Sequence, residues 1–266
     1  MTFTDDLGRK VTLSLPIKRI ISLSPAATEN LFAVGAGKLL VGITSADTYP
    51  VEVKKLPKVG DFGTPSYERI RELRPDVIIA ESGTIRRNDM DNLQNRLKIP
   101  VFAQKSSSFE DVVKHIEQFG KLTGQERNAS RVIKEMRDKA AIVAKRVRGT
   151  KAVTVFVEVS RDPLYGAGTG SFVDDLLKRA NGVNILKGNN PYPQVGKETL
   201  LLTDPDFYLV AVGDAEPLTP PELPPPFDHL RASKAHRVRA LRASLLFRPT
   251  PRLADGLLAL AKTLHP

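Results

Sequence analysis

The residues that could carry chemistry in this chain of 266 residues are few and scattered. The absence of cysteine excludes disulfides, thiolate metal sites and cysteine nucleophiles. No phosphate-binding P-loop and no nucleophile elbow is present. The sequence therefore predicts a protein that is not an enzyme, with no metal site and no resident cofactor. The four histidines, none at metal-ligand spacing, are His115, His229, His236 and His265.

A glycine-rich segment at residues 166–171 is the motif closest to a cofactor loop. It precedes a helical pattern at 172–177, and its backbone amides could hold an anion. The spacing of its glycines differs from the dinucleotide-binding fingerprint. We interpret it as a flexible loop beside a ligand site, with cofactor binding as the alternative.

Aromatic residues in the expected strand-end loops are better candidates for ligand contacts. The chain has no tryptophan and only 6% aromatic residues, so rings in loops stand out. Ligands on open α/β sheets bind beyond the carboxyl ends of the strands. Exposed rings there suit a flat, largely apolar ligand, although ordinary packing explains any single ring as well. The predicted ligand-binding residues are Pro25, Tyr49, Phe62, Tyr165 and Tyr192.

Short apolar runs alternate with helical patterns, which predicts an α/β fold with parallel sheets covered on both faces. A long amphipathic pattern at 125–148 interrupts the alternation and predicts one helix of about 20 residues. We expect two Rossmann-like lobes, at residues 1–122 and 149–266, joined by a rigid linker helix at 123–148. Strands are expected within 19–25, 39–44, 76–80, 101–103, 152–157 and 207–212.

One motif occurs in both halves of the chain. Glu68 precedes Pro75-Asp76 by seven residues, Glu198 precedes Pro205-Asp206 by the same interval, and a strand pattern follows each. The match predicts two lobes with similar ground plans. It places the two glutamates in the first turns of equivalent short helices, where a carboxylate favours the helix dipole. A capping role would explain each glutamate singly.

The formal charge of +10 raises nucleic acid as a partner. The basic residues gather at 127–151 and 231–242, and no aromatic residues interleave with the first group as base stacking requires. We therefore expect a solvated basic surface and no nucleic-acid partner. The proline-rich segment 218–226 is expected to form a surface loop, with partner recognition as the alternative.

Ten segments together carry a family resemblance that extends over nearly the whole chain. They are 6–9, 19–25 with Thr28 and Glu29, 47–50, 59–62, 68–76, 163–165, 182–185, 191–195, Glu198 and 248–256. With these residues the sequence resembles the periplasmic binding proteins of ABC importers that have a rigid helical linker. Within that group it looks most like the vitamin B12-binding proteins.

The resemblance implies a ligand cleft between two α/β lobes. Pro25 and Tyr49 match ligand positions of the family, and Phe62 and Tyr192 stand where a relative has tryptophans. Two further aromatic positions are Glu81 and Glu158 here, which makes the site smaller and more polar. The resemblance also implies that Glu68 and Glu198 match docking glutamates, which meet arginines on the two permease subunits.

We therefore predict a monomeric, non-enzymatic solute-binding protein that delivers cobalamin or a related corrinoid to an ABC permease dimer with its ATPases. We expect a periplasmic or membrane-anchored location, although residues 1–6 lack the features of a secretory signal. Membrane contact is expected only through the permease or a lost lipid anchor. The alternatives are a haem or ferric-siderophore carrier of the same fold, and a cytoplasmic protein that handles tetrapyrroles or metals.

Overall fold

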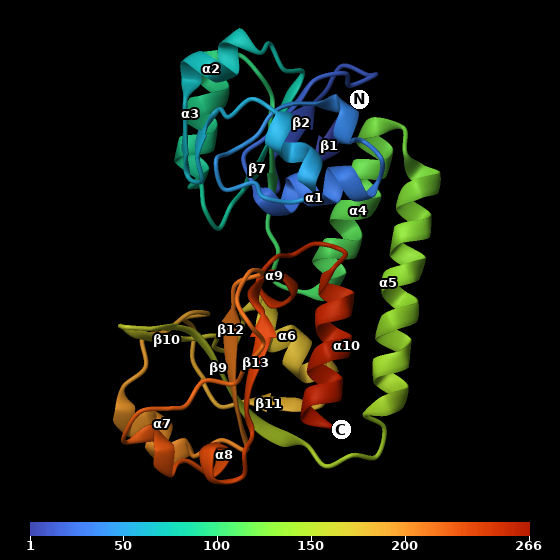
Figure 1. The fold of residues 1–266 in the computed structure, drawn as a ribbon. Coiled ribbons are helices and arrows are strands. Elements are labelled where there is room, and N and C mark those ends of the chain that lie inside the picture. Colours follow the sequence, from blue (N-terminus) through green and yellow to red (C-terminus); the bar gives the residue numbers. More distant parts are fainter. The chain divides into compact units, whose positions relative to one another are not determined.

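The computed structural model describes residues 1–266, which divide into two compact units. Unit 1 holds residues 1–106 and 110–134, and unit 2 holds residues 107–109 and 135–266 (Figure 1). The segment predicted as the linker forms helix α5 (Glu126–Arg146), and the division between the units falls within this helix.

Unit 1 is built on a four-stranded parallel sheet with the order β4-β3-β7-β8. Two antiparallel pairs, β1 with β2 and β5 with β6, lie outside this sheet. The strands are β1 (Thr2–Thr4), β2 (Lys10–Thr12), β3 (Ile20–Ser22), β4 (Leu40–Gly42), β5 (Gly60–Asp61), β6 (Thr64–Pro65), β7 (Val77–Glu81) and β8 (Val101–Gln104). The helices are α1 (Pro25–Ala33), α2 (Tyr67–Glu72), α3 (Arg87–Leu97) and α4 (Phe109–Thr123), with 3-10 turns at Gly37–Leu39 and Val51–Lys55.

The strands of unit 1 are apolar on both faces because helices cover both faces. Successive side chains of a strand point to opposite faces. Ile21 and Ile78 pack in one core cluster with Ile70 of α2 and Met90 of α3. Their neighbours Ile20 and Ile79 are equally buried, as are Val112, Ile116 and Phe119 on α4.

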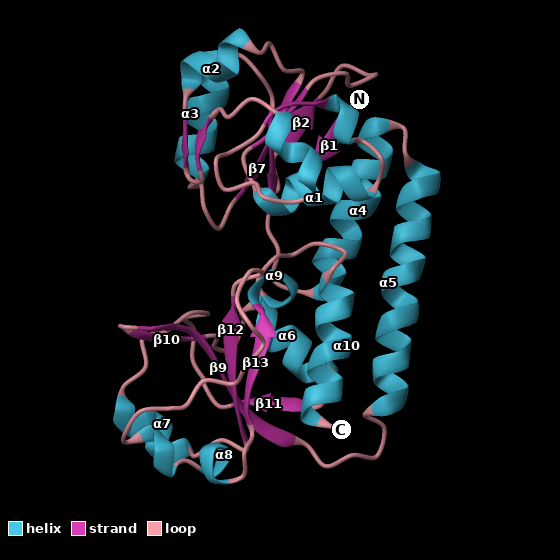
Figure 2. Ribbon diagram, in the orientation of Figure 1, coloured by secondary structure: helices cyan, strands magenta, loops and turns pink.

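Unit 2 is built on a five-stranded sheet with the order β10-β9-β12-β13, in which β11 also pairs with β9. Strand β10 runs antiparallel to β9, and the other pairs are parallel. Figure 2 shows α6 and α10 on one side of this sheet, with α7 and α8 on the other. The strands are β9 (Val153–Arg161), β10 (Leu164–Gly166), β11 (Gly182–Asn184), β12 (Phe207–Val212) and β13 (Val238–Arg242). The helices are α6 (Phe172–Arg179), α7 (Lys197–Thr203), α8 (Arg231–Lys234), α9 (Ala243–Leu246) and α10 (Leu253–Leu264), with a 3-10 turn at Phe227–His229.

The parallel strands of the two sheets follow the same order. In unit 1, β3 lies between β4 and β7, with β8 at the edge; in unit 2, β9 lies between β11 and β12, with β13 at the edge. The predicted α/β fold with parallel sheets is therefore confirmed.

The repeated Pro-Asp motif begins equivalent strands, β7 and β12, in the two sheets. Each aspartate accepts a backbone hydrogen bond at the start of the neighbouring strand. The Asp76 Oδ2 atom lies 2.8 Å from the Arg19 amide, and the Asp206 Oδ2 atom lies 2.8 Å from the Thr154 amide. The motif in the sequence therefore marks one repeated structural unit.

Several elements of the structure are not predicted by periodicity. Strands β1, β2, β10 and β11 have three residues each and lack the continuous apolar runs that mark the equally short β3 and β4. Strand β13 contains Arg239 and Arg242, which an edge strand tolerates and a central strand does not. No helix combines the length and the apolar character that a membrane crossing requires.

Candidate functional site

In each sheet the strand order reverses between the first and third parallel strands. These strands are β3 and β7 in unit 1, and β9 and β12 in unit 2. Open parallel sheets bind their ligands beyond the carboxyl ends of the strands at such a reversal. The loops at these ends are therefore the candidate site of each unit.

Three of the predicted ligand-binding residues lie in the loops of unit 1. Pro25 lies three residues after the end of β3 and is the first residue of α1, where its fixed φ suits a helix start. Tyr49 lies in the loop after β4, and Phe62 lies in the turn between β5 and β6. Tyr49 and Phe62 are each 46% exposed, so both rings are accessible in unit 1.

Hydrogen bonds hold the loop of Tyr49 beside the turn of Phe62. The Ser45 amide donates to the carbonyl of Gly60 at 3.0 Å. The Ser45 hydroxyl donates to Oδ1 of Asp61 at 2.5 Å. The structure thus brings together the segments that carry two of the predicted aromatic residues.

Glu81 is the last residue of β7 and lies at the same end of the sheet. Its side chain is half-buried, and Oε1 accepts one hydrogen bond, from the Ser106 amide at 3.3 Å. Burial and, to a smaller extent, the charges of Asp6 and Asp111 raise the pKa of Glu81 to about 8, against the effect of that bond. Glu81 is therefore mostly protonated at neutral pH.

The loop after β7 also contacts the turn of Phe62. Gly63, the residue after Phe62, has a φ of +90°, which favours glycine. A Cβ atom at this position would lie 3.3 Å from Cγ2 of Thr84. Glu81 and Phe62 are therefore carried by adjoining segments of unit 1.

A polar network adjoins Glu81 within unit 1. His115 Nε2 lies 2.5 Å from Oδ2 of Asp6, and its Nδ1 lies 3.5 Å from the Ser106 hydroxyl. Lys114 Nζ donates to Oδ1 of Asp6 at 2.5 Å. Burial alone would raise the pKa of Asp6, but the hydrogen bonds from His115 and Lys114 hold it well below its usual range. Sequence reasoning missed this network because 109 positions separate His115 from Asp6, so no local spacing signals it.

Tyr165 and Tyr192 lie on adjoining segments of unit 2. Tyr165 is half-buried in β10 and forms an antiparallel bridge with Gln194. The Gly168 amide donates to the carbonyl of Pro191 at 2.8 Å, which extends the pairing past Tyr192. Tyr192 is 41% exposed, and partial burial raises the pKa of its hydroxyl. Since β10 pairs with the last residues of β9, both tyrosines lie near the carboxyl end of this strand.

The glycine-rich segment before α6 is fixed by hydrogen bonds. The Ala167 amide donates to Val157, and the Thr169 amide and hydroxyl both donate to the carbonyl of Leu186. The Ser171 hydroxyl caps α6 by accepting from the Asp174 amide. Most backbone amides of the glycine-rich segment thus form hydrogen bonds within unit 2. The sequence predicted a flexible loop here, and the structure shows a loop that is held by hydrogen bonds.

Glu158 is buried in β9 and its carboxylate is fully engaged. The Tyr208 hydroxyl donates to Oε2 at 2.5 Å, and Arg161 donates to the same oxygen at 3.0 Å. Burial, followed by the charge and hydrogen bond of Glu158, raises the pKa of Tyr208. Of the two glutamates at expected aromatic positions, only Glu81 has a largely unbonded carboxyl.

Glu68 and Glu198 lie in the first turns of α2 and α7, as the repeated motif predicts. Both are exposed, and neither carboxylate forms a hydrogen bond or ion pair within the chain. Ser66 caps α2 by accepting from the Arg69 amide, so Glu68 is not needed for that role. Both glutamates are therefore accessible to a partner.

The profile of the family described as periplasmic binding protein matches residues 20–244. The chain belongs to this family. Among its relatives, an uncharacterized ABC transporter substrate-binding lipoprotein of Bacillus subtilis, YvrC, is 30% identical over 272 residues, which cover 100% of this chain and 86% of the relative. The vitamin B12-binding protein of Salmonella paratyphi A is 30% identical over 205 residues, which cover 75% of this chain and 76% of the relative.

Solved structures show the same fold as this periplasmic binding protein. The crystal structure of the vitamin B12-binding protein BtuF of Vibrio cholerae has a TM-score of 0.82 and 24% identity, and covers 94% of this chain and 97% of that chain. The haem-binding protein RhuT of Roseiflexus has a TM-score of 0.78 and 23% identity, and covers 94% of this chain and 98% of that chain. At these identities the likeness concerns the fold alone.

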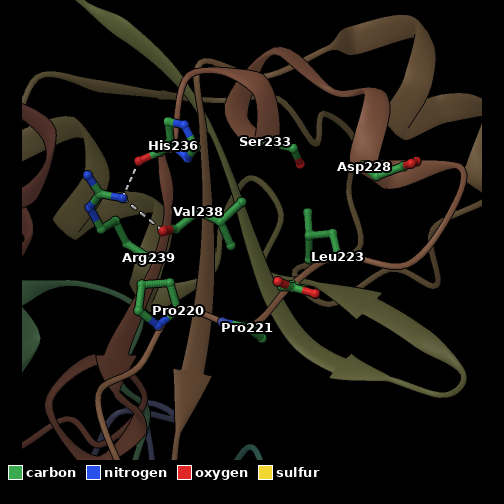
Figure 3. Close-up of a pocket in the computed structure, with 9 residues that line it drawn as sticks. Pro220, Pro221, Leu223, Asp228, Ser233, His236, Val238 and Arg239 are labelled. Atoms are coloured by element: carbon green, nitrogen blue, oxygen red, sulfur yellow. Dashed lines mark hydrogen bonds between the residues drawn. The ribbon is translucent and has the colours of Figure 1, made fainter.

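A separate cavity of about 390 Å³ lies under the proline-rich loop of unit 2 in this binding protein (Figure 3). Pro220, Pro221, Leu223 and Val238 supply apolar walls. Figure 3 shows the Arg239 guanidinium turned to the carbonyls of His236 and Val238 and not into the cavity. None of the predicted ligand-binding residues lines this cavity, which lies at the start of β13, away from the carboxyl ends of the strands.

The structure forms no group of three histidine, aspartate or glutamate side chains that could hold a metal ion. The carboxyl-end loops instead offer exposed rings and one protonated carboxyl. Aromatic rings can stack on a ligand, and a protonated carboxyl can form a hydrogen bond with it. Neither contact changes a covalent bond. The arrangement suits reversible binding.

Proposed function

We propose that this protein is the extracytoplasmic substrate-binding component of an ABC importer, which captures cobalamin or a related corrinoid and delivers it to a permease. The observation that carries the proposal is the pair of aromatic residues on adjoining segments of each unit. Tyr49 and Phe62 form the pair of unit 1, and Tyr165 and Tyr192 form the pair of unit 2. Membership of the periplasmic binding protein family supports the binding and delivery role.

A corrinoid fits these residues by its chemistry. Its macrocycle is broad and largely flat, and aromatic rings contact such a surface with large apolar area and little loss of side-chain entropy. The 30% identity to a vitamin B12-binding protein over most of the chain supports the same ligand class.

Delivery requires a surface that a permease can recognise, and Glu68 and Glu198 supply it in our proposal. Both carboxylates are exposed and unpaired, so arginines of a partner can bind them without breaking bonds within this chain. Leu202 lies one turn after Glu198 on α7 and is 86% exposed. An exposed leucine beside an exposed carboxylate is typical of a protein contact.

An extracytoplasmic location follows from the delivery role. The Bacillus subtilis relative is described as a lipoprotein, and the family as periplasmic. We propose that a tether of that kind, or release into the periplasm, keeps this protein at the outer face of the membrane.

Haem and ferric siderophores are the competing ligands, since a solved haem-binding protein has the same fold. Equilibrium dialysis of the purified protein against cyanocobalamin, haem and a ferric siderophore separates them. All three absorb visible light, and the chain has no tryptophan on which a fluorescence assay could depend. We expect saturable binding of cyanocobalamin at micromolar affinity or tighter. Retention of haem or the siderophore without cyanocobalamin would contradict the ligand assignment.

The matched variants for this assay are Phe62→Ala in the site and Leu202→Ala outside it. Both remove an exposed apolar side chain. Loss of cyanocobalamin retention in the first variant only would tie binding to the aromatic residues.

A further inference from the structure

Glu81 forms no ion pair with a basic side chain in the structure. Asp6 and Asp111 are the charged groups that act on it, and both disfavour its ionised form. The side chains of Lys114 and His115, which adjoin this network, are bonded to Asp6. Ionised Glu81 would therefore be disfavoured by the negative charges of Asp6 and Asp111.

The other groups around Glu81 are neutral. Its partner across the sheet is Gln104 of β8, which is buried and uncharged. Ser106 contributes only its backbone amide, at the long distance of 3.3 Å. The side chain of Lys105, the residue between them, is exposed, and its backbone amide donates to Asp6. In the structure none of these groups forms an ion pair with the carboxyl at the end of β7.

Glu81 lies at the end of the sheet where a ligand is expected to bind. The residue ends β7, at the reversal of strand order where open parallel sheets bind ligands. Its neighbouring loop contacts the turn of the exposed Phe62. Gly83, two residues later, has open space where a side chain would begin. A ligand that covers Phe62 therefore lies beside the loop that begins at Glu81.

We propose that Glu81 is a specificity-determining residue of the ligand site, which accepts ligands that present a neutral amide to the end of β7 and, in its ionised form, excludes ligands that present a carboxylate there. This inference rests on the proposed corrinoid function. Corrinoids carry amide side chains around the macrocycle, whereas haem carries two carboxylates. Hydrolysis of one amide of cyanocobalamin yields a monocarboxylic acid of almost the same size and shape.

The discrimination depends on pH in a defined direction. Below pH 8 Glu81 is mostly protonated and can donate a hydrogen bond to an amide or to a carboxylate. Above pH 8 it is mostly ionised, and a ligand carboxylate placed beside it meets a like charge in partly buried surroundings. A ligand amide suits both forms of Glu81, because its carbonyl accepts from the protonated form and its NH₂ group donates to the ionised form. The exclusion of acids therefore strengthens as pH rises through 8.

The test compares cyanocobalamin with its separated monocarboxylic acids by equilibrium dialysis at pH 6.5 and 9.5. For the isomer whose acid group faces Glu81, we expect the ratio of its Kd to the Kd of cyanocobalamin to rise about tenfold between these pH values. In Glu81→Gln the ratio should change less than about twofold, since glutamine does not ionise. Glu72→Gln, an exposed glutamate on α2, is the matched control and should behave as the unchanged protein.

The outcomes separate the inference from the function on which it rests. A ratio that is independent of pH for every isomer, or an equal rise in Glu81→Gln, would overturn the inference while corrinoid binding stands. Failure to bind cyanocobalamin at either pH would overturn both. Thermal unfolding checks that Glu81→Gln is folded, and Glu81→Ala, which should also show a pH-independent ratio, serves as a second variant.

Discussion

The hydroxyl of Tyr208 donates a hydrogen bond of 2.5 Å to the carboxylate of Glu158 inside unit 2. Tyr208 is fully buried, and only 6% of Glu158 is exposed. Arg161 pairs with the same carboxylate from the more exposed side. The bond connects β9 to β12, the two strands at which the order of this sheet reverses. Glu158 is thus a structural acid, and this explains why it does not take part in the candidate site.

Tyr208→Phe should destabilise the protein because it removes the hydroxyl and leaves a buried carboxylate oxygen with one fewer donor. We expect the free energy of unfolding to fall by about 1–3 kcal/mol, measured by urea denaturation. Tyr67→Phe is the matched control, since the hydroxyl of Tyr67 forms no hydrogen bond in the structure. Equal stability of the two variants would show that the Tyr208 bond contributes nothing.

Asp206→Asn should destabilise the protein at neutral pH and much less in acid. Burial alone would raise the pKa of Asp206, but the hydrogen bonds from Thr154 and the charge of Arg231 lower it below 3.8. An acid whose pKa is lowered on folding stabilises the folded state above its unfolded pKa, and the contribution is lost as pH falls. We expect a loss of about 1–3 kcal/mol at pH 7 that shrinks below pH 4. Urea denaturation at pH 7 and pH 3 measures it.

The control for this series is Asp228→Asn, since Asp228 is exposed and has only a distant contact with His229. Its effect should stay within about 0.5 kcal/mol at both pH values. If the difference in the free energy of unfolding between Asp206→Asn and the unchanged protein grew in acid, the pKa of Asp206 would not be lowered on folding.

Phe62→Ala and Tyr192→Ala should weaken corrinoid binding without unfolding the protein. Both residues are well exposed, so their removal costs little stability. We expect Kd to rise about tenfold in each variant, as for a central aromatic contact. Calorimetric titration with cyanocobalamin measures Kd, and thermal unfolding checks the fold. Unchanged Kd in both variants would exclude the aromatic pairs as the ligand contacts.

The double variant Glu68→Lys and Glu198→Lys should abolish corrinoid uptake while leaving Kd for the ligand unchanged. Reversal of both charges replaces attraction to partner arginines by repulsion. Uptake of labelled cyanocobalamin by vesicles that contain the permease measures delivery. Glu72→Lys, which changes another exposed glutamate of α2, should retain uptake. Full transport by the double variant would refute the docking role.

Much of the fold could be predicted from the sequence because its signals are local. The predicted strand within 207–212 is β12, and the pattern at 125–148 gives α5 at Glu126–Arg146. Apolar periodicity and the spacing from Glu68 to Pro75-Asp76 depend on neighbours along the chain. The repeated motif anticipated the equal strand order of the two sheets, since Asp76 and Asp206 make the same backbone contact.

The candidate site was harder to predict because its groups meet only in the folded chain. Tyr165 and Tyr192 were predicted as ligand residues, and this role stays a prediction. The two residues lie near each other only because an irregular segment pairs with β10. The environment of Glu81 depends on Asp6, which is far away in sequence. A carboxyl at the end of an apolar strand was the only local signal of its unusual ionisation.

The measurement that tests the central claim most directly is calorimetric titration of the purified protein with cyanocobalamin. Our account predicts one corrinoid bound per chain, at micromolar affinity or tighter. A folded protein that gives no binding heat and no displacement of a labelled corrinoid would contradict the ligand assignment. It would leave a periplasmic binding protein whose aromatic pairs serve a different ligand.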